Sequence, residues 1–143
     1  MAQFGPPAQL YLTDLASHLD IIRESVALTT STGGIPADCE VIVAEFDWGV
    51  TDPAQFKPPL DWVVGTDVAY NPSLIEPLLT ALGQLCGPET RVILGVSRAD
   101  TGFAFFDALE QRGYDFALVP RYEAAKSFAV TDSTLVEIRR RHA

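Results

Sequence analysis

The chain contains the stretch Val41-Ile42-Val43-Ala44-Glu45-Phe46-Asp47-Trp48-Gly49 and, further along, Trp62-Val63-Val64-Gly65-Thr66-Asp67-Val68-Ala69-Tyr70. In each stretch a short apolar run leads into acidic, glycine and aromatic residues. Such runs are typical of buried parallel strands that open into loops. In open α/β sheets, ligands bind outside the carboxyl ends of such strands. The two stretches therefore predict one shared site for a small molecule.

Strand and helix patterns alternate along the rest of the chain, which predicts an α/β fold with a mostly parallel sheet. The expected strands cover residues 9–13, 40–44, 61–65, 91–96, 116–119 and 134–138, and the last two form an antiparallel pair at a sheet edge. The expected helices cover residues 15–28, 74–86 and 101–111. The second should be capped by Ser73 and stopped by Gly87-Pro88. The third should have Phe103, Phe106 and Leu109 facing inward and Gly113 as its C-cap. We expect one domain over residues 10–143, after a disordered or extended segment at 1–9.

The composition is that of an ordinary globular domain. Of 143 residues, 48% are hydrophobic and 20% are charged, and the net charge is −9. This charge disfavours a nucleic-acid partner and fits a cationic peptide or protein substrate better. We see no stretch of the roughly 20 apolar residues that a membrane helix needs, and no secretory signal. The two cysteines have no metal-binding spacing, so we expect a cytoplasmic protein without a metal site or a membrane partner.

Asp14 and Trp48 are the candidates for binding a nucleotide-like ligand. In nucleotide-binding α/β folds, an acid at the end of the second strand accepts hydrogen bonds from ribose hydroxyls. The alternative is that Asp14 caps the following helix. Trp48 follows a strand and precedes Gly49, where its ring can stack on adenine. Otherwise Trp48 covers the sheet edge, which is the more common case, and Trp62 is expected to be core.

Asp67 and Tyr70 are the candidates for holding an amine nucleophile. Alkyl transfer needs the lone pair of the amine, and free lysine has a pKa of roughly 10.4. A carboxylate can attract the cation and orient the deprotonated nitrogen, while the tyrosine walls off the alkyl stem. The alternative is that Asp67 is a loop residue that caps the helix at Ser73.

The sequence shows no other catalytic constellation. His18 and His142 are isolated, no Ser-His-Asp or Cys-His set is apparent, and no glycine loop has phosphate-binding spacing. Residues 139–141 are all arginine and are interpreted as a solvated strand end.

With these residues in hand, the chain resembles the METTL21-like lysine methyltransferase family, within the seven-strand class I methyltransferases. The shared segments run in order from about residue 10 to residue 140. They are Leu12-Thr13-Asp14-Leu15, Glu45-Phe46-Asp47-Trp48-Gly49, Gly65-Thr66-Asp67-Val68-Ala69-Tyr70, the leucine-rich segment 74–82 and the strand 92–98.

The resemblance implies a partial Rossmann-like methyltransferase sheet and S-adenosylmethionine as the methyl donor. Asp14 would bind the donor's ribose, Trp48 would pack on its adenine, and Thr66 would line the pocket. Asp67 and Tyr70 would occupy the family's Asp-x-x-Tyr motif at the lysine of a substrate protein.

The family also has a first strand and a glycine-rich Glu-x-Gly-x-Gly loop, and neither is present in this sequence. That strand lies in the middle of the family's sheet, and the loop holds the methionine end of the donor. We therefore expect the C-terminal portion of a protein-lysine methyltransferase, weakly active or inactive alone. The alternatives are a non-catalytic methyltransferase-fold binding module and, less well supported, a nicotinamide-binding Rossmann protein.

Overall fold

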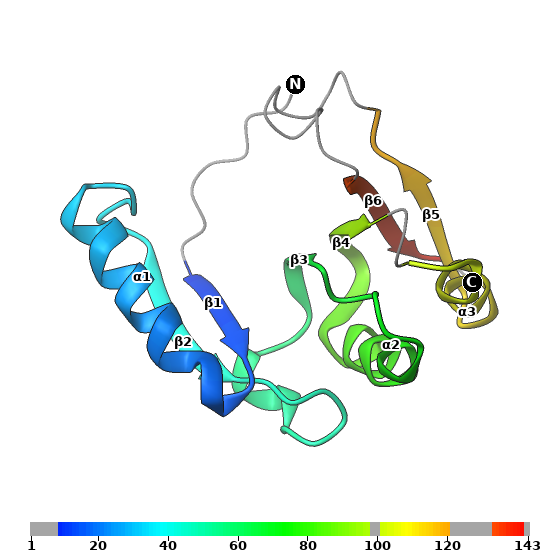
Figure 1. Cartoon of the computed structure of the whole chain (residues 1–143), viewed down its shortest axis with the longest axis horizontal. Helices are drawn as coiled ribbons and strands as arrows, with labels where there is room; N and C mark the ends of the chain where they lie inside the picture. Colours follow the sequence, from blue (N-terminus) through cyan, green and yellow to red (C-terminus); the bar gives the residue numbers. More distant parts are fainter. Residues whose placement is uncertain (1–8, 98–100, 121–132, 142–143) are drawn as a thin grey trace. The chain divides into compact units, whose positions relative to one another are not determined.

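The computed structural model describes residues 9–97, 101–120 and 133–141 (Figure 1). Contacts between Cα atoms divide the chain into two compact units, Met1–Thr51 and Asp52–Ala143. Each unit has its own sheet and its own helices, so each is described by itself.

The first unit is a single β-α-β element. Strand β1 (Gln9–Asp14) pairs in parallel with β2 (Glu40–Glu45), and the register aligns Asp14 with Glu45. The 3-10 turn η1 (Ala16–His18) and helix α1 (Leu19–Ser31) connect the two strands. The two strands therefore end at the same edge, as expected for parallel strands joined by a helical crossover.

The predicted first helix differs in detail from the observed one. It is divided into η1 and α1 at His18, and α1 continues to Ser31, three residues beyond its expected end. Of the α1 residues only Leu19 is buried, whereas Ile21 and Leu28 are both 67% exposed. Threonine and serine hydroxyls near the C-terminal end donate to carbonyls three or four residues earlier, which holds the last turns together.

The second unit is a four-stranded sheet in the order β3-β4-β6-β5. These strands are β3 (Leu60–Thr66), β4 (Cys86–Ser97), β5 (Tyr114–Leu118) and β6 (Ser133–Arg140). β3 pairs with β4 in parallel, and β6 is antiparallel to both of its neighbours. The predicted antiparallel pair is confirmed, with β5 at the edge and β6 inside the sheet.

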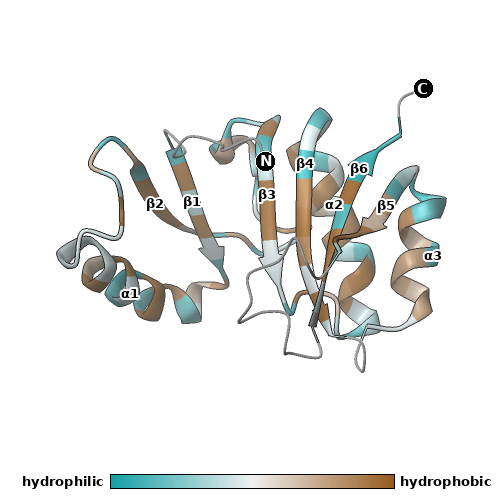
Figure 2. Ribbon diagram, turned by 90° about the horizontal axis from the view of Figure 1, so that it is seen from above, coloured by the Kyte–Doolittle hydropathy of each residue, from teal (hydrophilic) through white to brown (hydrophobic). Residues whose placement is uncertain are grey.

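Two helices cover one face of this sheet, as Figure 1 shows for α2 (Ile75–Leu85) and α3 (Phe103–Gln111). The alternation along the strands explains the arrangement, because successive side chains point to opposite faces. On the helix side lie residues that are at most 5% exposed: Val92, Leu94 and Val96 of β4, and Val136 and Ile138 of β6. From the helices, Leu79, Leu82, Phe105 and Leu109 complete this core. Figure 2 shows the apolar central segments of these strands.

The predicted inward face of α3 is correct at Leu109, which is completely buried, but wrong at Phe103. Phe103 was expected to face inward, but its side chain is 88% exposed, whereas Phe105 is completely buried. Phe106 is half-buried and lies beside Phe116 of β5, with ring centroids 4.9 Å apart. The helix begins at Phe103, two residues later than predicted, and the burial of Phe105 and Leu109 sets the inward face. Gly113, with φ +79°, lies just beyond the helix as expected.

Two more predicted helix signals are also displaced. Asn71, not Ser73, is the cap before α2, because its Oδ1 accepts hydrogen bonds from the backbone N–H and the hydroxyl of Ser73. It caps the short 3-10 turn η3 (Pro72–Leu74) that leads into α2. At the other end, α2 ends at Leu85, and Gly87 and Pro88 already belong to β4.

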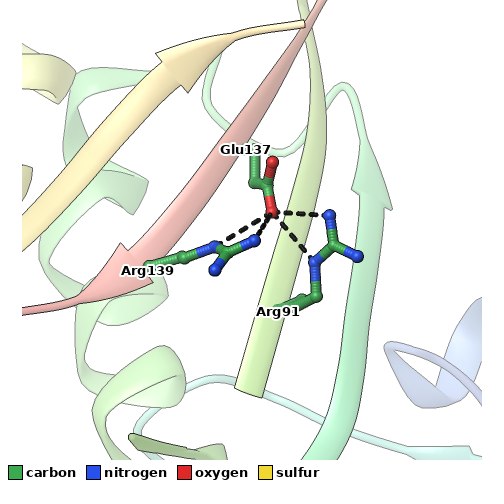
Figure 3. A network of polar contacts seen from close by, with 3 residues as sticks. All are labelled: Arg91, Glu137 and Arg139. Atoms are coloured by element: carbon green, nitrogen blue, oxygen red, sulfur yellow. Dashed lines mark hydrogen bonds and ion pairs between the residues drawn. The ribbon is translucent and has the colours of Figure 1, made fainter. Parts of the chain in front are cut away.

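The opposite face of the sheet carries a polar network, shown in Figure 3. Glu137 Oε1 accepts hydrogen bonds from Arg91 (2.9 and 2.8 Å) and from Arg139 (3.1 and 2.8 Å). The Arg91 guanidinium also lies 4.4 Å from the ring centre of Trp62. Trp62 was expected to be core, but it is half-buried and stacks beneath this cation. The network joins β3, β4 and β6 through side chains.

Burial lowers the reactivity of the thiol in the second unit. Desolvation raises the pKa of Cys86 to about 11, and Cys86 is only 7% exposed. Cys39 is half-buried, and neither cysteine is in a disulfide. Cys86 is therefore part of the core of the second unit.

Candidate functional site

Asp14 ends β1 with its carboxylate half exposed. Its Oδ1 accepts a hydrogen bond from the backbone N–H of Leu15 at 2.7 Å and lies 3.0 Å from His18 Nδ1. No helix-capping hydrogen bond from Asp14 is present, since neither η1 nor α1 has a side-chain cap. The capping alternative for Asp14 is therefore wrong, and the carboxylate lies at the strand end, where a ligand could reach it.

His18 is the residue that the sequence analysis missed. It was described as isolated, yet its imidazole contacts Asp14 and is the main cause of the lowered pKa of that carboxyl group. The hydrogen bond from His18 lowers the Asp14 pKa most, and partial burial opposes it by a smaller amount. The sequence carries no clear signal for this contact, because Asp14 belongs to β1 and the helical turn η1 begins only at Ala16.

Trp48 lies in a tight turn beyond the end of β2. The backbone N–H of Val50 and that of Thr51 both donate to the carbonyl of Asp47, at 3.0 and 2.8 Å. Gly49 has φ +81°, a conformation that favours glycine at the third position of such a turn. Trp48 is half-buried. The backbone N–H of Phe46 donates to the carbonyl of Asp14 at 3.0 Å. The turn that contains Trp48 therefore begins beside Asp14, at the same edge of the sheet.

The Asp-x-x-Tyr segment follows the end of β3. Asp67 has φ +54°, and its backbone N–H donates to the carbonyl of Gly95 at 3.1 Å. Its carboxylate forms no hydrogen bond with another residue in the described ranges. The segment alternates between solvent and core, because Ala69 is 4% exposed whereas Tyr70 is 56% exposed. Asp67 and Tyr70 therefore face solvent, and the buried side chain of Ala69 between them anchors the loop.

Gly65 lets this loop pack closely against the sheet. A Cβ added there would lie 3.2 Å from Leu94 Cδ2 and 3.5 Å from a methyl carbon of Val68. Thr66, the last residue of β3, is exposed at the same strand end. The prediction that Asp67 caps the following helix is wrong, because Asn71 fills that role.

The candidate residues thus form two groups, each at the carboxyl ends of parallel strands. Asp14 and Trp48 lie together in the first unit, and Thr66, Asp67 and Tyr70 lie together in the second. Their assignment to a donor and to a lysine remains a prediction. Among the described residues no group of acidic, histidine and cysteine side chains could hold a metal ion. Within the same ranges, no helix is both long and apolar enough to cross a membrane.

Solved structures of methyltransferases share this fold. The chain matches precorrin-6y C5,15-methyltransferase of Geobacter metallireducens with a TM-score of 0.62 and 13% identity, over 94% of this chain and 68% of that one. Human N-acetylserotonin methyltransferase, solved with S-adenosylmethionine, matches with a TM-score of 0.60 and 11% identity, over 94% of this chain and 41% of that one. The predicted class I methyltransferase fold is confirmed. Strands β1 and β2 pair in parallel, as do β3 and β4, and β6 is antiparallel to both of its neighbours.

A curated relative gives a closer sequence match. EEF1A lysine methyltransferase 3 of Xenopus tropicalis is 32% identical over 83 residues, which are 58% of this chain and 34% of the relative. The matched part is thus about a third of the length of that relative. A sequence model of the lysine methyltransferase family matches residues 1–112, a range that contains all five candidate residues. The chain belongs to the lysine methyltransferase family.

Proposed function

We propose that this chain acts in protein-lysine N-methylation with S-adenosylmethionine as the methyl donor. One observation carries the proposal: the family match over residues 1–112 includes both strand-end groups. The match to a lysine methyltransferase named for EEF1A makes that protein the first substrate to test.

On the donor side, the chemistry of the first unit fits an adenosine group. The Asp14 carboxylate is an acceptor for ribose hydroxyls, and its Oδ2 has no hydrogen bond to a described residue. Trp48 supplies a flat apolar ring in the turn beyond β2. The family resemblance gives Thr66, the exposed last residue of β3, as a further candidate for binding the donor. When bound, the donor supplies the methyl group, and these residues would bind and orient the donor.

On the substrate side, Asp67 and Tyr70 would receive the lysine. The exposed Asp67 carboxylate would attract the ammonium group. After that group has lost a proton to solvent, the carboxylate would orient the neutral amine, whose lone pair is needed for the transfer. Tyr70 offers an exposed ring along the alkyl stem. The net charge of −9 favours encounter with a basic segment of a substrate protein.

We expect the 143-residue chain to bind the donor weakly. Among the described residues, Gly33 and Gly34 follow helix α1, not a strand, so they form a turn and not a donor-binding loop. In addition, β1 pairs only with β2, and β3 only with β4, within the described sheets. Among the described residues, we assign none to the methionine end of the donor.

Calorimetric titration with S-adenosylmethionine, followed by a radiolabelled methyl-transfer assay on EEF1A, tests the proposal. We expect a dissociation constant weaker than about 100 µM, in the low-affinity range for a partial site. Transfer should be slow and should be lost in Asp67→Asn and Tyr70→Ala, while both variants keep the donor affinity of the wild type. Asp115→Asn, at an exposed position on β5, is the matched control.

Two results would contradict parts of this proposal. Micromolar donor affinity would show that the chain needs no further segment to bind the donor. Methyl transfer that is unaffected by both substitutions would remove Asp67 and Tyr70 from the site.

A second candidate function is a non-catalytic binding module with a methyltransferase fold. Within the described sheets, β1 pairs only with β2 and β3 only with β4. This favours the binding module, since a strand with an unpaired edge is a place where another polypeptide can pair. This alternative predicts no transfer and no donor binding at any practical concentration, so the same titration distinguishes the two.

A further inference from the structure

The Asp14 carboxylate is held asymmetrically. Oδ1 accepts the Leu15 N–H at 2.7 Å and lies 3.0 Å from His18 Nδ1, whereas Oδ2 has no partner among the described residues. A carboxylate oxygen offers about two lone-pair positions, so these two contacts fill Oδ1. The oxygen left for an incoming hydroxyl is Oδ2.

The position of His18 is itself fixed by the local backbone. His18 is the last residue of η1, and its N–H donates to the carbonyl of Leu15 at 2.9 Å. The next residue, Leu19, is 7% exposed and anchors the start of α1. The imidazole is therefore carried by a turn that is tied to the same strand end as Asp14.

We propose that His18 is a positioning residue that locks the plane of the Asp14 carboxylate and so presents Oδ2 to a ribose hydroxyl pair. The proposal rests on the proposed role of Asp14 in donor binding. The terminal torsion of aspartate is broad, so an exposed carboxylate would otherwise rotate and would have to be ordered when the ligand binds. Holding one oxygen in advance removes that cost from binding.

The surroundings of Asp14 support a local role for His18. Its hydrogen bond is the largest cause of the lowered Asp14 pKa, and the carboxylate therefore stays ionised as an acceptor for ribose. The side chains of His18 and Asp14 are 56% and 48% exposed, so the contact is accessible to a ligand. A ligand with a ribose should sense this contact, and a ligand without one should not.

The test compares adenosine with adenine on the full 143-residue chain, with binding followed by NMR chemical shifts at millimolar ligand. His18→Ala should weaken adenosine binding about three- to tenfold, the size expected for one lost hydrogen bond, and should leave adenine binding unchanged. His18→Asn should restore adenosine binding, because the Asn amide nitrogen is attached to Cγ, as Nδ1 is. Titration of the Asp14 carboxyl signal should show its pKa raised in His18→Ala and still lowered in His18→Asn.

Each other outcome overturns a definite part of the reasoning. If Asp14→Ala weakens adenosine binding and His18→Ala does not, the role of His18 is wrong and the proposed function stands. If Asp14→Ala binds adenosine as the wild type does, or the wild type binds neither ligand, the donor side of the proposed function fails, and the role of His18 fails with it. If His18→Ala weakens the binding of adenine and of adenosine equally, His18 has only a structural role. If the pKa of Asp14 is unchanged in His18→Ala, the contact between the two side chains is absent.

Discussion

Replacing Phe105 by alanine tests how α3 is oriented, because the structure and the sequence pattern disagree there. The Phe105 side chain is completely buried in the core between α3 and the sheet, and its ring lies 5.3 Å from that of Phe106. Phe103, in the same helix, is 88% exposed. The two phenylalanines therefore form a matched pair that differs in burial.

The expected magnitude follows from that burial. Removing a fully buried phenylalanine ring costs about 3–5 kcal/mol, through lost transfer free energy and the cavity left behind. Phe103→Ala removes an exposed ring and should change the free energy of unfolding by no more than about 0.5 kcal/mol. For a chain of this length, the Phe105→Ala loss corresponds to a fall in Tm of roughly 10 °C or more.

Urea unfolding followed by circular dichroism measures both variants against the wild type. The m-value should stay constant, so that a change in midpoint reports stability. If Phe103→Ala is as destabilising as Phe105→Ala, or more so, α3 presents the face that the sequence pattern predicted, and the core described above is wrong.

Three further predictions concern the rest of the second unit. Glu137→Gln should lower the free energy of unfolding by about 1–2 kcal/mol at pH 7, because it weakens the charge-assisted hydrogen bonds with Arg91 and Arg139. Desolvation raises the Glu137 pKa, but hydrogen bonds from Arg139 and Arg91 outweigh it, so the folded-state pKa lies below the ordinary 4.5. The stabilisation is then present above pH 4.5 and is lost as pH falls through the folded-state value. Urea unfolding of the wild type and Glu137→Gln at neutral and acidic pH should show that their difference in free energy of unfolding becomes smaller in acid. A difference that grows in acid would contradict the ion pairs of Glu137. Thiol labelling at pH 8 should modify Cys39 well before Cys86, whose pKa is raised to about 11 by burial, and equal rates would contradict that burial. Gly65→Ala should cost about 1–3 kcal/mol, because its Cβ would crowd Leu94, which is itself 1% exposed; a neutral effect in thermal melts would show that the loop can shift freely.

The sequence was sufficient to predict the positions of the strands because each one combines an apolar run with a clear boundary signal. The runs at β2 and β3 end in acids and glycine, and all six predicted strands are present within a few residues. The antiparallel pairing of β5 and β6 also followed from their position after the last helix. These are features that local pattern and chain connectivity determine together.

Features that depend on contacts between elements were harder to predict. The choice between Phe103 and Phe105 depends on where α3 begins, a boundary that periodicity does not define well. Trp62 was expected to be core because its strand is apolar, yet Arg91 of the neighbouring strand reaches over its ring. The role of Asp14 in a site stays a prediction, and its contact with His18 is visible only once η1 brings the two side chains together.

A single spectroscopic titration tests the donor site most directly, because the chain has only two tryptophans, Trp48 and Trp62. With 5-fluorotryptophan incorporated, each gives a separate fluorine NMR signal, and Trp62→Phe assigns them. On addition of S-adenosylhomocysteine, the Trp48 signal should shift saturably, and the Trp62 signal, beneath Arg91, should stay in place. Asp14→Ala should weaken the Trp48 response. A Trp48 signal that does not move while calorimetry detects binding, or a shift confined to Trp62, would contradict a donor site at the ends of β1 and β2.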